Sequence, residues 1–286
     1  MLFLSRMKRI LFYACVLSLG IGILSIAKQV VITTQAQSRQ TNQFIEAART
    51  NATLSRDLQW VFGGKPQRGW YLYTLLIQRL IDTRENPTTR KFAIAVARWQ
   101  EKSGLKPSGI IDEETLYKMI AAWQDARLKD RSVAAPEQLM TAPISEFYDP
   151  TRARELCQLE RRTYAAYKRM VAAAIADRSL RLGHKRSELA PEEKYLKIIS
   201  AFRSPEYQEK LRRESPNSGS AGLAVRSPHF TGRALDLYVG GDPVDTADSN
   251  RALQVNTAVY KWLVRNAERF GFRPYCYEPW HWEYVR

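Results

Sequence analysis

The sequence predicts an α+β protein. Apolar residues recur at helical spacing from Gln43 to Arg127 and again from Thr151 to Ala176. Two short stretches near the C-terminus, Arg233 to Val239 and Trp280 to Val285, alternate in the manner of strands. Because helices and strands mix without a repeated strand–helix–strand unit, we expect a small mixed or antiparallel sheet with helices in a C-terminal domain. An all-α module of three helices and an N-terminal membrane segment are expected to precede that domain.

Length and charge set the broad class. The chain has 286 residues, enough for one large or two modest domains. With 44 Lys and Arg against 29 Asp and Glu, its net charge of +15 favours polyanions such as nucleic acid, anionic lipid or an acidic cell-wall polymer. No Lys- or Arg-dense tract carries a nucleic-acid-binding motif, so we expect a wall or membrane surface and no nucleic acid. A generally basic, soluble surface is the open alternative.

The N-terminus predicts export. Arg6, Lys8 and Arg9 precede an apolar run of about 18 residues from Ile10 to Ala27, close to the lower limit for a membrane span. This charge pattern keeps the N-terminus in the cytoplasm and exports the rest. We assign residues 1–37 to an uncleaved signal anchor or a cleaved signal peptide, with Thr34-Gln-Ala36 as the candidate cleavage site. The protein would be anchored facing the periplasm or cell wall, or secreted if cleaved.

The module at residues 43–127 shows three helical patterns. They cover Tyr71 to Ile81, Thr89 to Gln100, and Glu113 to Trp123, and Asp112 is placed to cap the third. Residues 128–150 contain three prolines and few periodic apolar residues, so we expect a linker there.

The C-terminal domain, residues 151–286, is expected to alternate helices and strands. Thr231 and Gly232 offer a bend ahead of the first alternating stretch. The loop from Ser215 to Arg226, rich in Ser, Gly and Pro, is expected to be mobile enough to gate a site. The remaining elements are a helix over Thr151 to Ala176, a strand over Tyr195 to Phe202, a helix over Pro205 to Arg213, and a helix from Asp248 or Ser249 to about Phe270, ended by Gly271.

Two of the three histidines fall in short stretches that carry candidate metal ligands. His229, Asp236 and His281 are an imidazole, a carboxylate and a second imidazole, the donor set of a catalytic zinc site with a fourth position open to water. Glu278 is a free carboxylate three residues before His281 and a candidate general base. Glu283 shares the strand face of His281, so it is either a rival base or a partner that orients the imidazole. One His–carboxylate pair alone would be an ordinary structural pair, but a full ligand set with a base favours a metal site.

These residues also carry a family resemblance. The pattern Ser227-x-His229-x-x-Gly232-x-Ala234-x-Asp236-Leu237, followed by Glu278-x-Trp280-His281, resembles the signature of the D-alanyl-D-alanine carboxypeptidase/dipeptidase family of zinc peptidases (peptidase family M15, VanY type). The resemblance spans roughly residues 195–286. It implies that His229, Asp236 and His281 ligate zinc and that Glu278 is the base.

The same resemblance implies further roles around the site. Arg203, in Ser200-Ala-Phe-Arg203-Ser204, would polarise the scissile carbonyl and stabilise the oxyanion, and Gln208 would help hold substrate. We add Ser227, which opens the motif, and Trp280, between base and ligand, as substrate-binding candidates. On physical grounds alone, Arg203 would be an ordinary surface charge.

The helical module resembles the small three-helix peptidoglycan-binding domain that accompanies wall hydrolases. The resemblance covers about 50 residues and departs from the family pattern in the first helix. A plain helical spacer is the alternative. The residues that carry it are Thr89, Phe92-Ala93, Ala97, Trp99-Gln100, Gly104-Leu105, Gly109-Ile110-Ile111-Asp112 and Thr115.

The sequence therefore predicts an exported zinc peptidase that acts on peptidoglycan stem peptides. A D,D-carboxypeptidase that releases terminal D-alanine is the first expectation. An endopeptidase or an L,D-carboxypeptidase of the same fold, a non-catalytic wall-binding protein, and a charge-driven lipid or nucleic-acid binder are the alternatives. Cys157 and Cys276 could pair in an oxidising compartment.

Overall fold

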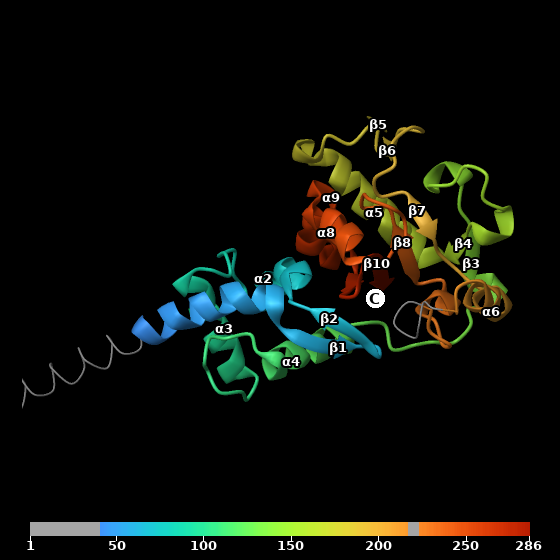
Figure 1. Cartoon of the computed structure of the whole chain (residues 1–286). Coiled ribbons are helices and arrows are strands. Elements are labelled where there is room, and N and C mark those ends of the chain that lie inside the picture. Colours follow the sequence, from blue (N-terminus) through green and yellow to red (C-terminus); the bar gives the residue numbers. More distant parts are fainter. Residues whose placement is uncertain (1–40, 217–222) are drawn as a thin grey trace, which may run out of the picture.

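The computed structural model of the chain describes residues 41–216 and 223–286 (Figure 1). The predicted N-terminal segment, residues 1–37, lies outside the described residues, as does part of the predicted gating loop. Within the described ranges, no helix is both long enough and apolar enough to cross a membrane.

The module that follows is not all-α, and the expectation of three helices alone was wrong. Residues 41–57 are helical, and a β-hairpin comes next, β1 (Gln59–Phe62) paired antiparallel with β2 (Lys65–Arg68). Phe62 pairs with Lys65, so Gly63 and Gly64 form a two-residue turn with φ of 56° and 79°. Glycine adopts these angles freely, and such turns match the twist of a hairpin.

The three predicted helices of the module are present. They are η1 with α2 (Tyr71–Tyr73 and Thr74–Leu80), α3 (Arg90–Lys102) and α4 (Glu113–Asp125). Thr89 caps α3, and the predicted cap Asp112 accepts a hydrogen bond from Thr115 N at 2.9 Å. Gln100 is buried and donates to Ile110 O and Thr115 Oγ1, so it ties α3 to α4.

The expected linker at residues 128–150 is ordered and packed. It contains η2 (Pro136–Gln138), β3 (Leu139–Thr141) and η3 (Ile144–Glu146). Strand β3 pairs antiparallel with β4 (Gln158–Glu160), and Tyr148 N donates to Ile198 O at 2.9 Å. These backbone bonds bind a proline-containing segment to the C-terminal part of the chain. The domain boundaries themselves stay predictions.

The C-terminal part is built on a four-stranded antiparallel sheet, which confirms the α+β class. Its order is β7 (Ile198–Ser200), β8 (Ala234–Leu237), β10 (Glu278–Tyr284) and β9 (Phe272–Tyr275). Helices α5 (Arg161–Ala176), α8 (Asp248–Asn256) and α9 (Ala258–Asn266) lie beside this sheet (Figure 1). The other short elements are η4 (Arg154–Leu156), η5 (Arg178–Leu180), β5 (His184–Lys185), β6 (Glu188–Leu189), α6 (Pro205–Glu214), η7 (Pro228–Thr231) and η8 (Ala267–Phe270).

Two predicted helices have different bounds because capping side chains intervene. Helix α5 (Arg161–Ala176) begins ten residues later than expected, where Glu160 accepts a hydrogen bond from Thr163 N at 2.7 Å. The expected helix from residue 248 to 270 is split into α8 (Asp248–Asn256), α9 (Ala258–Asn266) and η8. Thr257 adopts extended backbone angles and accepts from Tyr260 N, so it starts a new helix.

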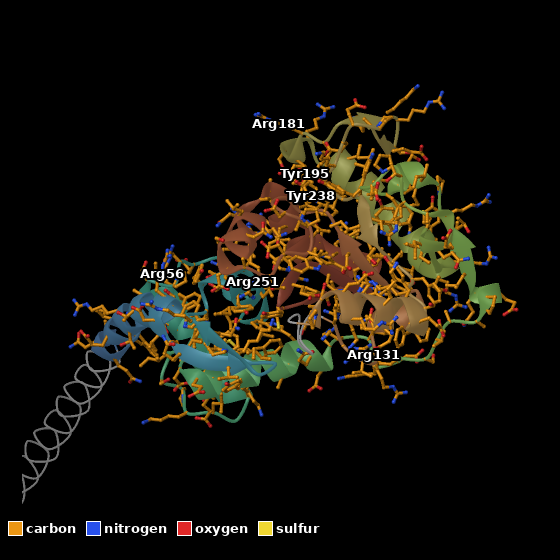
Figure 2. The ribbon with its side chains drawn as sticks, turned by 45° about the vertical axis from the view of Figure 1, so that its right-hand side comes forward. Arg56, Arg131, Arg181, Tyr195, Tyr238 and Arg251 are labelled. Carbon is orange, nitrogen blue, oxygen red and sulfur yellow. The ribbon has the colours of Figure 1, made fainter. Side chains whose placement is uncertain are left out.

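One hydrophobic core runs through both parts of the molecule. It joins Trp60, Leu76 and Trp123 of the helical module to Leu263 and Trp282 of the C-terminal part. Arg251, which Figure 2 labels between these two parts, is buried; its guanidinium donates to Tyr73 Oη, Gln67 Oε1 and Tyr277 O, each at 3.2 Å. The helical module is therefore packed onto the C-terminal part. Cys157 and Cys276 are both buried and unpaired, so the possible disulfide does not form in this structure.

Candidate metal centre and active site

Three elements bring the predicted ligands together. His229 lies on η7, Asp236 on β8 and His281 on β10, where the antiparallel register pairs His281 directly with Asp236. Ser227 caps η7 by accepting from His229 N at 3.3 Å, and Gly232 turns the chain into β8 with φ of 66°. The predicted bend at Gly232 thus allows His229 and Asp236 to face one point despite their sequence separation.

The three side chains form a group that could hold a metal ion. His229 Nε2 lies 3.3 Å and His281 Nδ1 lies 2.9 Å from Asp236 Oδ1, and the ligand atoms all lie within 4.8 Å of one another. Tetrahedral zinc with bonds of about 2.0–2.1 Å separates its ligand atoms by roughly 3.3 Å. All three residues are buried, and two imidazoles with one carboxylate suit zinc chemically. The residues present therefore fit a zinc ion.

The outer nitrogen of each imidazole has a partner that orients the ring. His229 Nδ1 lies 2.6 Å from Ala201 O, a carbonyl that only accepts, so Nδ1 carries the hydrogen and Nε2 is left with its lone pair. His281 Nε2 lies 3.1 Å from Glu283 Oε1, which leaves Nδ1 facing Asp236. Such partners fix the tautomer and direction of metal-binding histidines. Of the two roles considered for Glu283, the geometry supports the orienting one.

The electrostatics of the group favour a cation. Burial and the Arg203 charge lower the pKa of His229 to about 4, so this ring is neutral at pH 7. Burial opposes ionisation of Asp236, but its contact with His229 and the positive charge of Arg203 hold its pKa well below the usual range. Burial also disfavours the charged form of His281, yet hydrogen bonds to Asp236 and Glu283 raise its pKa to about 9. A metal ion at His281 Nδ1 would replace that proton.

Glu278 lies beside this group. Its Oε2 is 4.0 Å from His281 Nδ1, and the residue lines the cavity described below. Burial, reinforced by the charge of Asp236, raises the pKa of Glu278 to about 8. A carboxyl group with a raised pKa can both accept and return a proton near neutral pH. The position and chemistry are those required of the predicted general base.

Arg203 follows β7 and reaches the same group. Its Nη2 donates to Asp236 Oδ2 at 2.5 Å, and its Nε donates to Ser200 Oγ at 2.8 Å. Gln208, on α6, accepts from Arg203 Nη1 at 3.4 Å and donates to Ala224 O at 2.9 Å. Arg203 lines the cavity, whereas Gln208 is buried, does not line it, and connects Arg203 to Ala224 through hydrogen bonds.

A cavity of about 410 Å³ opens over these residues. Ser227 and Trp280, both predicted to bind substrate, line it together with His229, Glu278 and His281. Sequence reasoning missed the arginines that add positive charge to its wall. No motif or spacing links them to the site. They are Arg127, Arg131, Arg152 and Arg226.

A buried His–Asp–His group beside a protonatable carboxyl and an arginine, at the floor of a cavity, is the arrangement of metal-dependent hydrolases. Residues 157–286 match the family model described as VanY, D-alanyl-D-alanine carboxypeptidase, and this part of the chain is a domain of that family. No curated protein sequence gives a significant match.

Several solved structures show a distant likeness. One is the LdcB LD-carboxypeptidase, at 23% identity and a TM-score of 0.38, over 55% of this chain and 71% of that chain. Another is VanYB in complex with D-alanine-D-alanine, at 23% identity and a TM-score of 0.31, over 45% and 72%. A third is a mutant of the D,D-pentapeptidase VanY with Zn(II), at 22% identity and a TM-score of 0.31, over 45% and 74%. The assignment of residues 157–286 to the VanY family rests on the family model alone, and these distant likenesses are not used to support it.

Proposed function

We propose that the chain is an exported, zinc-dependent peptidase that hydrolyses peptidoglycan stem peptides. Its preferred activity in this proposal is that of a D,D-carboxypeptidase, which releases terminal D-alanine. The observation that supports this most strongly is the buried group of His229, Asp236 and His281, with Glu278 beside it, inside the family-matched part of the chain. The preference for a D-amino acid comes from the family description, and an L,D-carboxypeptidase or an endopeptidase would use the same residues.

The side chains around the group have separate tasks. Zinc held by His229, Asp236 and His281 would supply Lewis acidity and lower the pKa of a water molecule toward about 7. Glu278 would accept the proton of the attacking water at a carboxylate oxygen and pass it to the leaving amine. Arg203 presents its guanidinium to the cavity, where it would stabilise negative charge developing on the scissile carbonyl oxygen, a contribution of about 3–4 kcal/mol for a single donor. Trp280 would form an apolar wall of the pocket.

We further propose that residues 43–127 hold the enzyme on the cell wall. The support is the resemblance of this module to peptidoglycan-binding domains and a net charge of +15, which suits an acidic polymer or an anionic membrane surface. Gln100, one of the residues that carry the resemblance, is buried in hydrogen bonds within the module, so its role is structural. Membrane attachment through residues 1–37 belongs to the same proposal.

The test combines metal content with product analysis. The purified full chain is assayed for bound metal and incubated with muropeptides ending in D-Ala-D-Ala, with and without chelator, and products are read by mass. We expect about one zinc per chain and chelator-sensitive loss of one D-alanine. Zinc with another product mass would support the L,D or endopeptidase activity. If the chain binds no metal and releases no product, the enzyme proposal is refuted. Retention of the chain on insoluble wall material would then favour a binding protein.

A further inference from the structure

The carboxylate that orients His281 is held by residues outside the family-matched part of the chain. Glu283 is fully buried, and its Oε1 lies 3.1 Å from His281 Nε2. The same Oε1 accepts from Arg127 Nε at 3.2 Å and from Arg127 Nη2 at 2.5 Å. The other oxygen, Oε2, accepts from the backbone N–H of Leu128 at 3.0 Å. Arg127 and the Leu128 amide, together called the Arg127 clamp, therefore donate hydrogen bonds to both carboxylate oxygens of Glu283.

Arg127 is itself held in place by the end of the helical module. It follows Ala126, the C-cap of α4, and its Nη1 donates to Gln124 Oε1 at 2.8 Å. Its guanidinium lies over the ring of Tyr275, 3.9 Å from the ring centroid, and that ring packs edge-on against His281 at 5.8 Å. Arg131, labelled in Figure 2, adds a second cation 3.9 Å from Glu283 Oε1. The position of α4 thus sets the position of the clamp.

We propose that Arg127 is a positioning residue for the metal ligand His281, so that the helical module completes a metal centre whose ligands all lie in residues 157–286. Without Arg127, Glu283 would be a fully buried carboxylate that has lost its strongest cationic partner. With both Arg127 bonds gone, Glu283 Oε1 would no longer be held within hydrogen-bond distance of His281 Nε2, and the acceptor that fixes the ring would be lost. The inference rests on the proposed function only in requiring that His281 bind a cation.

The first experiment measures zinc affinity of the full chain by competition with a chelator. We expect Arg127→Ala to weaken zinc binding about 10–100-fold, the range seen when partners of metal ligands are removed. Arg79→Ala is the matched control, because Arg79 Nη2 also joins the helical module to the C-terminal part, through Glu268 Oε2 at 2.9 Å, on residues away from the metal group. Arg79→Ala should leave zinc affinity within about twofold, below the loss expected for a ligand partner. Equal losses in both variants, or no loss in Arg127→Ala, would overturn the proposal.

A second set of variants keeps the test decisive if Arg127→Ala does not fold. Arg127→Lys retains the charge but not the fork that makes two bonds to Glu283, and we expect at least about threefold weaker zinc binding. In a Glu283→Gln background, where the buried charge is absent, Arg127→Lys should cause no further loss, because the two residues act through one contact. Additive losses, or wild-type affinity in Arg127→Lys, would contradict the proposal. A wild-type chain that binds no zinc would refute the proposed function as well. If the wild-type chain is active and binds zinc, but substitution of Arg127 leaves zinc affinity unchanged, only this inference is refuted.

Discussion

Two glutamates on the same strand have opposite environments. Glu278 lines the cavity, and burial raises its pKa to about 8. Glu283 is also buried, but its hydrogen bond to His281 and the His281 and Arg127 charges outweigh burial and lower its pKa to about 2. A group that stays ionised and has both oxygens bonded cannot exchange protons with a substrate at neutral pH. We therefore propose Glu278 as the general base and Glu283 as the residue that orients His281.

The first prediction concerns Glu278→Gln. The variant keeps the shape of the side chain and removes the proton acceptor, so we expect kcat/KM for muropeptide hydrolysis to fall at least about 100-fold. Zinc affinity should change by less than about threefold, because Glu278 is not among the three ligands. Hydrolysis rates and chelator competition measure the two effects, with the exposed Glu206→Gln as control. Near-wild-type activity in Glu278→Gln would show that another group is the base.

The sequence predicted the ligand candidates and the partner of His281, Glu283, but it did not predict the residues that hold Glu283 in place. His229, Asp236 and His281 lie in two motifs with fixed internal spacing; pairing of β8 with β10 brings Asp236 and His281 together, and the bend at Gly232 adds His229. The contact of Arg127 with Glu283 joins residues 156 positions apart through the packing of a separate module. No local pattern encodes such a contact, because it depends on where α4 ends against the sheet.

At the scale of elements, the junction between η7 and β8 determines whether two ligands converge. Gly232 has φ of 66°, and a Cβ there would lie 2.8 Å from Glu160 N and 2.9 Å from Leu139 Cδ2. Gly104 offers a comparison, with φ of 75° and no atom within 4 Å of an added Cβ. The two glycines share a backbone conformation and differ in the space available.

The second prediction uses this pair. Both Gly232→Ala and Gly104→Ala should lose about 1 kcal/mol of unfolding free energy from the unfavourable φ. Gly232→Ala should lose roughly 1–3 kcal/mol more, because backbone and packed side chains must shift. Denaturant unfolding of the two variants measures the difference. Equal destabilisation would mean that the contact with β4 at Gly232 is loose.

The predicted secondary structure was wrong where a turn or a helix cap of one or two residues interrupts a longer apolar pattern. The hairpin β1–β2 is marked by Gly63-Gly64, but Pro66 and the absence of a long alternating run concealed it. The apolar pattern continues from α8 into α9, so the pattern alone predicted one helix. The cap at Thr257 interrupts it with a single hydrogen bond to Tyr260 N at 3.1 Å.

At the scale of the whole molecule, the shared core predicts that both parts unfold together. Arg251 is the polar centre of their interface and is almost fully buried. We expect Arg251→Ala to lower the unfolding free energy by about 2–4 kcal/mol, because several charge-assisted hydrogen bonds are lost and their acceptors stay buried. Denaturant unfolding read by tryptophan fluorescence measures the loss, with the exposed Arg265→Ala as control. Two separate transitions in the wild-type chain would contradict a cooperative core.

The last prediction concerns stability at alkaline pH. Burial raises the pKa of the Cys276 thiol from 9.0 to about 12, and burial also raises the pKa of the Tyr73 and Tyr260 hydroxyls. In the unfolded chain these groups lose their protons at ordinary values, so above pH 9 the folded state binds more protons than the unfolded state. The unfolding free energy must then fall as pH rises, by up to about 1.4 kcal/mol per pH unit for each fully titrating group.

The measurement is a series of denaturant titrations between pH 8 and pH 10. In this window the Cys276 thiol is the first of the three groups to contribute, because its ordinary pKa is the lowest. The decline should therefore be shallower in Cys276→Ala, even though removal of the sulfur lowers stability at pH 8. A stability that stays flat to pH 10, or an unchanged slope in Cys276→Ala, would mean that the thiol is accessible to water in the folded protein.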